Sequence, residues 1–174
     1  MVSSASLTGY RSAVGVRDAF LHLLRDRRAR FHLLLEELGL RLDSDRDLSK
    51  RVGGGWTLGE HMVHIAAWER RYARKASGAA RLPYPSQWQK FNDAVFTEWR
   101  GVEPDAARRE YEAAHEEIVA AVSALPPDGD PDRPKLLEGW NLEMAPRHYR
   151  EHANILSEHA GLPRPPPWRG RIVD

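Results

Sequence analysis

Apolar residues recur along most of this chain at the three- and four-residue spacing of amphipathic helices. From Val14 to Gly39 the repeating positions lie three, four or seven residues apart, and Gly39 is the predicted stop. These positions are Phe20, Leu23, Leu24, Phe31, Leu34, Leu35 and Leu38. The pattern therefore predicts a first long helix with one apolar stripe that faces a core.

The second predicted helix opens at a recognisable N-terminal signal. Thr57 and Glu60 have the Thr-x-x-Glu spacing of a capping box, in which each side chain bonds a free backbone N–H of the first turn. The helix is predicted to end near Ser77-Gly78. The side expected to face the core carries His61, His64, Ile65, Trp68 and Tyr72.

Three further helices are predicted toward the C-terminus. A short one spans Gln87 to Arg100, and a long one opens at Pro104, because proline is favoured in the first helical turn. The last long helix begins between Leu142 and Pro146 and runs to Ala160, with Gly161 as its stop. Its inward side is expected to carry Ala145, His148, Tyr149, His152, Ile155, Leu156 and His159.

Four long amphipathic helices and one extra short helix predict an all-α four-helix bundle. We expect residues 1–13 to be a flexible N-terminus, residues 14–161 to form the bundle domain and residues 162–174 to be an extended, proline-rich tail. Residues 40–55 are predicted as a polar connection, and no strand is predicted. Because some connections are longer than minimal, the topology need not be simple up-down-up-down.

Composition narrows the classes of function. The 26 Lys and Arg residues nearly balance 25 Asp and Glu residues, which excludes a nucleic-acid binder that relies on bulk positive charge. The absence of Cys excludes disulfides, metal–thiolate sites and a cysteine nucleophile. No apolar run approaches the roughly 20 residues of a membrane span, and residues 1–10 lack the apolar region of a signal peptide. We therefore expect a cytoplasmic protein with neither a nucleic acid nor a membrane as partner.

Three groups of conspicuous residues are interpreted as structural. A basic cluster on the first helix is expected to be a solvent-exposed face: Arg25, Arg27, Arg28 and Arg30. Four histidines are expected at the surface or in helix packing: His22, His32, His115 and His159. Four tryptophans are expected to pack in the core, with the wall of an apolar pocket as the alternative: Trp56, Trp68, Trp88 and Trp99.

The candidate chemistry lies in the other histidines. His148 and His152 are four residues apart on one predicted helix, so both imidazoles share a face and can reach a single metal ion. His64 lies on the inward side of another helix, and bundles build metal sites from facing helices. Spacing alone leaves two interpretations open: a three-histidine metal site, or buried histidines bonded to backbone carbonyls. His61 is expected to be packed or partly exposed, with a hydrogen-bond donor behind a metal ligand as the alternative.

One segment, Trp56 to Ala66, has the sequence Trp-Thr-Leu-Gly-Glu-His-Met-Val-His-Ile-Ala. It resembles the Trp-Ser/Thr-x-x-Glu/Asp-x-x-x-His-Ile/Leu opening of the second helix in the DinB/YfiT-like superfamily. Members of that superfamily are four-helix bundles, many with a metal held by three histidines, two of them from a late His-x-x-x-His pair. The resemblance implies that His64, His148 and His152 hold a divalent metal ion. Imidazole ligands suit zinc, nickel, copper or iron, and zinc and nickel are our first candidates.

Other segments resemble one branch of that superfamily, the ClbS/DfsB-type four-helix bundle proteins. They are Asn92 to Phe96, His115 to Ile118 and the pair His148-Tyr149, and the resemblance covers most of residues 15–160. That branch does not depend on an intact three-histidine site. It therefore implies an alternative in which His148 and His152 line a metal-free pocket.

The superfamily resemblance implies an activity on small molecules. The first hypothesis is a metal-dependent hydrolase or thiol transferase that acts on a small electrophilic substrate, with an activated water or a thiolate as the nucleophile. Because the chain has no Cys, the thiol would be a separate low-molecular-weight thiol. The alternatives are a metal-free ClbS/DfsB-like hydrolase, or a small-molecule-binding or stress protein without metal catalysis.

Two residues are candidate catalytic helpers. Glu60 lies one turn before His64 and is predicted as a general base, with helix capping as its structural alternative. Tyr149 is predicted to donate to a bound anion, with core packing as its alternative. A homodimer is a further hypothesis, because tryptophan-rich apolar segments outside the long helices need cover.

Overall fold

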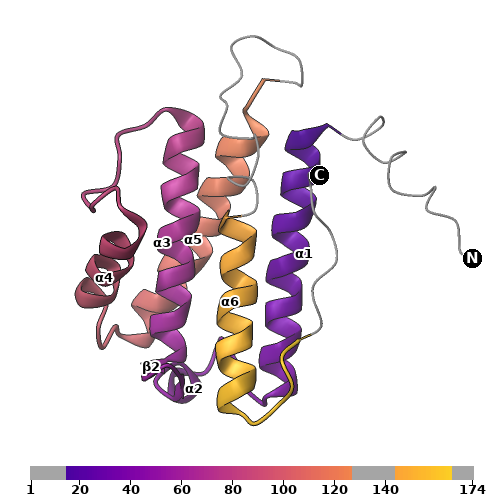
Figure 1. The fold of residues 1–174 in the computed structure, drawn as a ribbon, viewed down its shortest axis with the longest axis vertical. Coiled ribbons are helices and arrows are strands. Elements are labelled where there is room, and N and C mark those ends of the chain that lie inside the picture. Colours follow the sequence, from indigo (N-terminus) through magenta and orange to yellow (C-terminus); the bar gives the residue numbers. More distant parts are fainter. Residues whose placement is uncertain (1–14, 127–143, 166–174) are drawn as a thin grey trace, which may run out of the picture.

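The computed structural model describes residues 15–126 and 144–165, and these residues are mostly helical (Figure 1). The prediction of an all-α bundle is confirmed. The four long helices are α1 (Val16–Glu37), α3 (Leu58–Ser77), α5 (Pro104–Ser123) and α6 (Met144–His159), and α4 (Trp88–Glu98) packs on α3. None of the described helices has the length and apolar character needed to cross a membrane. The predicted flexible N-terminus and most of the predicted tail lie outside the described residues.

The connection between α1 and α3 contains short elements that the hydrophobic pattern did not predict. A single helical turn, α2 (Asp45–Leu48), precedes a small antiparallel hairpin of β1 (Arg51–Gly53) and β2 (Trp56–Thr57). The turn between the strands uses two glycines with positive φ, +58° at Gly54 and +79° at Gly55. The prediction that residues 40–55 contain no strand is therefore wrong, because strands of two or three residues are too short to show an alternating pattern.

The helix ends follow the predicted signals. Thr57 caps α3: its hydroxyl accepts a hydrogen bond from the Glu60 N–H, and Glu60 Oε2 accepts one from the Thr57 N–H at 2.7 Å. Gly78 ends the same helix with a φ of +70°, a left-handed conformation that favours glycine. Gly161 follows α6 with the same φ. Local interactions therefore set both ends of α3 and the end of α6.

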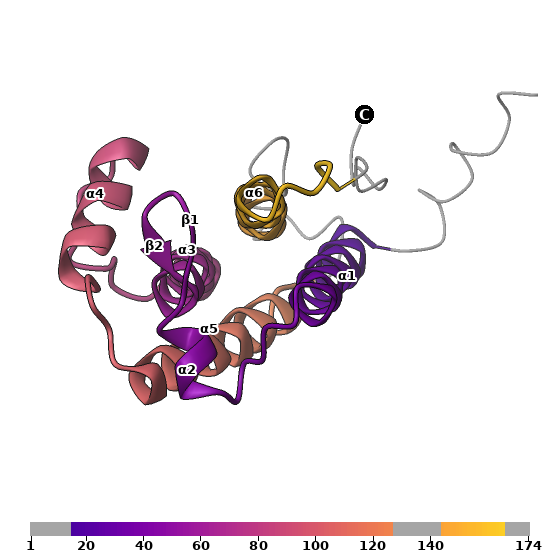
Figure 2. The same cartoon turned by 90° about the horizontal axis from the view of Figure 1, so that it is seen from below.

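Helix α3 is the most deeply enclosed element. Every residue from Leu58 to Glu69 is buried. Helices α5, α6 and α4 and the hairpin pack around it, and Figure 2 shows the hairpin beside α3 with α4 on one side and α6 on the other. The polar side chains in this stretch must therefore find partners within the protein. They are Glu60, His61, His64 and Glu69.

A buried polar network joins the four long helices. Glu69 of α3 is fully buried, and its Oε1 accepts a hydrogen bond from the Tyr149 hydroxyl of α6 at 2.8 Å. The same oxygen lies 3.0 Å from His115 Nδ1 of α5. On α5, the Tyr111 hydroxyl lies 3.0 Å from His32 Nε2 of α1. His32 and His115 therefore pack between helices as expected, but their buried partners were not predicted.

The basic cluster of α1 is only partly exposed. Arg27 and Arg28 are buried, so the prediction of a solvent-exposed face is wrong for these two residues. The Arg28 guanidinium lies 4.2 Å from the centre of the Tyr111 ring and 2.5 Å from Glu112 Oε2. A nearby carboxylate and an aromatic face make burial of this guanidinium tolerable.

We expect Thr57→Ala to lower the free energy of unfolding by about 1 kcal/mol, because it removes the side-chain cap of α3. Urea unfolding followed by circular dichroism measures the change. Thr97→Ala is the matched control, since Thr97 is exposed on α4 and alanine favours helix. Equal stabilities of Thr57→Ala and the wild type would contradict a stabilising capping box.

Candidate metal centre

Four buried histidines from two helices meet beside the hairpin. His61 and His64 belong to α3, and His148 and His152 belong to α6. The ring centres of His64 and His152 are 5.0 Å apart, those of His64 and His148 are 5.7 Å apart, and those of His148 and His152 are 6.3 Å apart. The structure therefore brings together the three histidines predicted as ligands and adds His61 to the cluster.

The outer nitrogen of His64 is held by α4. His64 Nε2 lies 3.0 Å from Asn92 Oδ1, and the same oxygen accepts a hydrogen bond from the Trp68 indole N–H at 2.9 Å. The indole can only donate, which identifies the Asn92 atom as the carbonyl oxygen. His64 Nε2 must therefore carry a proton, and in the neutral ring Nδ1 carries none.

Backbone carbonyls define the tautomers of two other rings. His148 Nδ1 donates to the Met144 carbonyl at 2.9 Å, and His61 Nε2 donates to the Gly53 carbonyl at 3.2 Å. A carbonyl oxygen only accepts, so each of these nitrogens carries the proton. In the neutral rings, His148 Nε2 and His61 Nδ1 each have a free lone pair.

His152 lies between His61 and His64. Its Nδ1 is 2.6 Å from His61 Nδ1, and its Nε2 is 3.1 Å from His64 Nδ1. A proton must lie in the shorter contact, because two bare nitrogens would repel at that distance. Since the proton of neutral His61 is on Nε2, the shared proton belongs to His152 Nδ1. His152 Nε2 is then unprotonated.

Two unprotonated nitrogens therefore face each other at the centre of the cluster, His64 Nδ1 and His152 Nε2. The chain of contacts from the Gly53 carbonyl through His61, His152 and His64 to Asn92 has four links and needs four protons. Three neutral imidazoles supply three. A further proton or a metal cation between the facing lone pairs would remove their repulsion.

Burial disfavours the further proton. Desolvation lowers the pKa of His61, His64 and His148 to about 4, against smaller opposing effects of their hydrogen bonds to Gly53, Asn92 and Met144. Burial and the three neighbouring histidines lower the pKa of His152 well below its usual range. The four rings are therefore neutral at pH 7, the form in which imidazole binds metals.

The donor set fits a divalent metal ion. Lone pairs are available on His64 Nδ1, His148 Nε2 and His152 Nε2, and the opposite nitrogen of each ring donates a hydrogen bond, as is usual for histidine ligands. The 3.1 Å separation of His64 Nδ1 from His152 Nε2 is close to the ~3.3 Å between two nitrogens of a tetrahedral zinc site with bonds of about 2.0–2.1 Å.

His148, the third predicted ligand, lies further from the other two histidines. Among residues 15–126 and 144–165, no three His, Asp or Glu side chains already surround one metal position. The wider ring spacings of His148 indicate that this is the ring that would have to approach. Glu151 Oε2 lies 3.8 Å from His148 Nε2 and adds a negative charge at the edge of the cluster.

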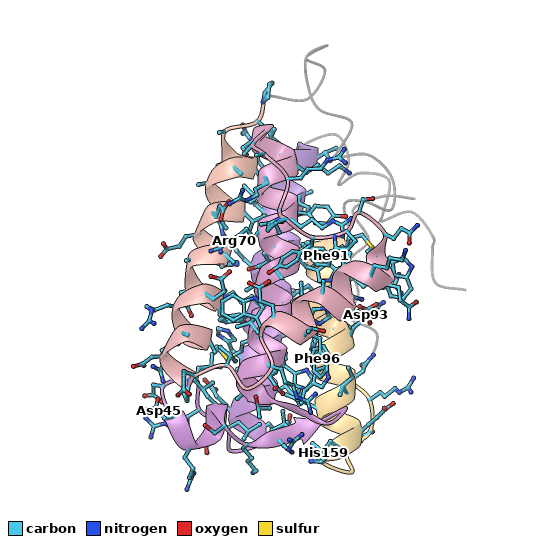
Figure 3. All side chains as sticks on the ribbon, turned by 90° about the vertical axis from the view of Figure 1, so that its left-hand side faces the viewer. Asp45, Arg70, Phe91, Asp93, Phe96 and His159 are labelled. Carbon is cyan, nitrogen blue, oxygen red and sulfur yellow. The ribbon has the colours of Figure 1, made fainter. Side chains whose placement is uncertain are left out.

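Aromatic rings cover the histidines. The ring centre of Trp56 in β2 lies 5.0 Å from that of His64 and 4.6 Å from that of Phe96 in α4, on which Trp56 stacks. Figure 3 labels Phe96 on α4, in front of the bundle. Trp68 stacks on His148 at 4.4 Å. A shallow hollow beside His64 is lined by Trp56, Glu60, Val63, Val95, Phe96 and Trp99. The hollow is therefore mainly apolar, but it has no room for a bound molecule, and its side chains would have to move to admit one.

The tryptophan predictions are confirmed in part. Trp68 is buried in the core, and Trp56 and Trp99 are half-buried and line the hollow. Trp88 is 61% exposed at the start of α4, so its predicted core position is wrong. Trp88 opens the helix one turn before Phe91, which occupies the buried position instead.

The two predicted catalytic helpers are held by other partners. Glu60 Oε2 accepts the Thr57 N–H, and Glu60 Oε1 accepts the Gly101 N–H at 2.9 Å. The Tyr149 hydroxyl is fully buried and donates to Glu69. Tyr149 would have to break its bond to Glu69 to donate to an anion, whereas each Glu60 oxygen keeps a second lone pair; both roles stay predictions.

Several partners of the histidines were not predicted from the sequence. Asn92 lies in the segment that resembles the ClbS/DfsB-type proteins, but nothing in its spacing indicates a hydrogen bond from α4 to His64 of α3. The Gly53 and Met144 contacts use backbone carbonyls, which every residue has. The only sequence signal near His61 is the run of Gly53, Gly54 and Gly55, which is typical of a sharp turn.

A family model of the DinB superfamily matches residues 23–162. The matched range includes all four histidines of the cluster and Asn92. No curated protein and no solved structure matches the chain.

We expect acid to destabilise the metal-free protein between pH 6.5 and about pH 4. An unfolded histidine takes up its proton near pH 6.5, whereas the folded pKa of about 4 for His61, His64 and His148 opposes protonation. The stability that depends on neutral rings is therefore complete above pH 6.5 and is lost as the pH falls. One such histidine contributes roughly 2 kcal/mol of loss between pH 7.5 and pH 5.

Urea unfolding in the presence of a chelator, repeated across this pH range, measures the effect. A free energy of unfolding that stays constant or rises as the pH falls from 6.5 to 4.5 would contradict the neutral cluster.

Proposed function

Because this chain belongs to the DinB superfamily, we propose that it is a metal-dependent enzyme in which His64, His148 and His152 hold a divalent cation. The observation that supports this best is the pair of unprotonated nitrogens, His64 Nδ1 and His152 Nε2, at 3.1 Å. A cation that both nitrogens contact would convert their repulsion into attraction. Zinc and nickel are the first candidates, since neutral imidazole suits both.

The remaining residues of the site would orient the ligands and exclude water. Asn92 and the Met144 carbonyl hold the outer nitrogens of His64 and His148, so that the inner lone pairs keep their direction. Trp56 and Phe96 form a stacked apolar cover over the cluster. When bound, the cation would supply Lewis acidity that activates water or a thiol as a nucleophile near neutral pH.

We propose that the reaction is hydrolysis or thiol transfer on a small electrophilic molecule. The hollow beside His64 has an apolar lining but no room for a molecule as it stands, so its side chains would move apart to accept an apolar part of the substrate. Since the chain has no Cys, the thiol for a transfer reaction would come from a low-molecular-weight thiol.

A metal-free hydrolase or small-molecule-binding protein is the second candidate. The aromatic lining formed by Trp56, Phe96 and Trp99 favours it, because such a surface binds apolar molecules without a metal. The two candidates differ in whether function survives loss of His64.

We expect the protein, expressed without a His tag and loaded with zinc or nickel, to retain about one divalent ion per chain after dialysis. His64→Ala removes one ligand, and its metal content should fall at least tenfold while its helical circular dichroism stays. His22→Ala is the matched control, since His22 is an exposed histidine of α1. A wild type that retains no metal, or a His64→Ala variant that retains it fully, would refute the metal site.

The reaction class is tested with a small apolar epoxide as probe. Hydrolysis adds water and yields a diol, whereas thiol transfer opens the ring to a hydroxy thioether when a low-molecular-weight thiol is supplied. The metal-loaded wild type should form one of these products faster than the uncatalysed reaction in buffer does. The rate with His64→Ala should be at least tenfold lower than the wild-type rate. Full turnover by His64→Ala in chelator would instead support the metal-free candidate.

A further inference from the structure

We infer that His61 is a positioning residue, which holds His152 in the tautomer whose Nε2 lone pair faces His64. The arrangement of protons follows from the four-histidine cluster itself. Its consequence for metal binding rests on the proposed function. His61 is not assigned to the ligand set, because its contact with His152 is a hydrogen bond.

The geometry of the pair is that of a short, directed hydrogen bond. His61 is 1% exposed, and its Nδ1 lies 2.6 Å from His152 Nδ1. The two rings are nearly perpendicular, at 84°, with centres 4.9 Å apart. Two ligands of one tetrahedral zinc would be ~3.3 Å apart, so this contact is too short for a shared metal.

The Gly53 carbonyl determines which way this hydrogen bond points. It accepts the proton of His61 Nε2, so neutral His61 can only accept at Nδ1. Gly53 is held against α6: a Cβ at this position would lie 2.8 Å from Ile155 Cγ2 and 2.9 Å from the Ile155 carbonyl. The hairpin therefore packs directly on the helix that carries His152, and its carbonyl is fixed relative to both histidines.

Without His61 the cluster has a competing arrangement. His152 Nδ1 would be a buried donor without its acceptor, which is unfavourable. The proton of His152 can move to Nε2, where His64 Nδ1 accepts it across the 3.1 Å contact. That tautomer satisfies both rings and places a proton where the proposed cation would bind. His61 thus prevents His152 and His64 from satisfying each other.

Three substitutions separate the two hydrogen bonds of His61. Asparagine places a carbonyl oxygen near the position of Nδ1, so His61→Asn keeps an acceptor for His152. Glutamine places its amide near the position of Nε2, so His61→Gln keeps the bond to Gly53 and loses that acceptor. His61→Phe keeps the ring shape and loses both. His22→Phe is the control for removal of an exposed histidine.

Zinc affinity, measured by competition with a chromophoric chelator, is the first readout. We expect His61→Gln and His61→Phe to bind zinc about 10- to 100-fold more weakly than the wild type, and His61→Asn and His22→Phe to stay within about threefold. Equal affinities in all variants, or a loss in His61→Asn as large as in His61→Phe, would overturn the inference.

Imidazole nitrogen NMR of the metal-free wild type is the second readout and needs no metal. We expect His152 to carry its proton on Nδ1 and His61 on Nε2, and His61→Gln to move the His152 proton to Nε2. A wild-type His152 protonated on Nε2 would overturn the inference. Wild-type protein with the expected tautomers but no zinc binding would refute the proposed function alone.

Discussion

The burial of α3 is the constraint on which the rest of the structure depends. Every side chain from Leu58 to Glu69 lies inside the protein, so the polar ones cannot reach water. Helix α6 supplies several of their partners: His152 contacts His61 and His64, and Tyr149 bonds Glu69. An unsatisfied buried polar group costs roughly 1–3 kcal/mol, so these contacts favour one placement of α6 along α3. The contacts that place the helices also assemble the histidine cluster.

Two buried polar clusters involve α3, the Glu69 network and the histidine cluster. They differ in which atoms are left without a favourable partner. In the Glu69 network, Oε1 contacts Tyr149 and His115, whereas Oε2 is buried without a hydrogen-bond partner among the described residues, and we assign the network a role in packing. The histidine cluster is one proton short, and burial opposes a further proton. A protein that keeps such a repulsion in its interior gives up some stability, and a cation that removes it would bind and stabilise at once.

Particular residues show why the sequence predicted some features and not others. The helices were predictable because their apolar periodicity, the Thr57 capping box and the stop glycines act within a few residues. The His148–His152 pair was predictable because one helical turn fixes its geometry. The hairpin was missed because strands of two or three residues carry no periodic signal. Burial of Arg28 was missed because it depends on Tyr111 and Glu112 of another helix.

The sequence by itself predicted the four long helices, α4 and most of their inward positions, with the exposed His159 as an exception, since these follow from short-range spacing, whereas the ligand set of His64, His148 and His152 came from the family resemblance. Only the tertiary structure decided that His61 completes the cluster, that Asn92 and two backbone carbonyls define the tautomers, and that Glu60 and Tyr149 have other partners. The physical reason is that a proton's position depends on the acceptor across the contact. That acceptor lies on another element, at a distance no local pattern encodes.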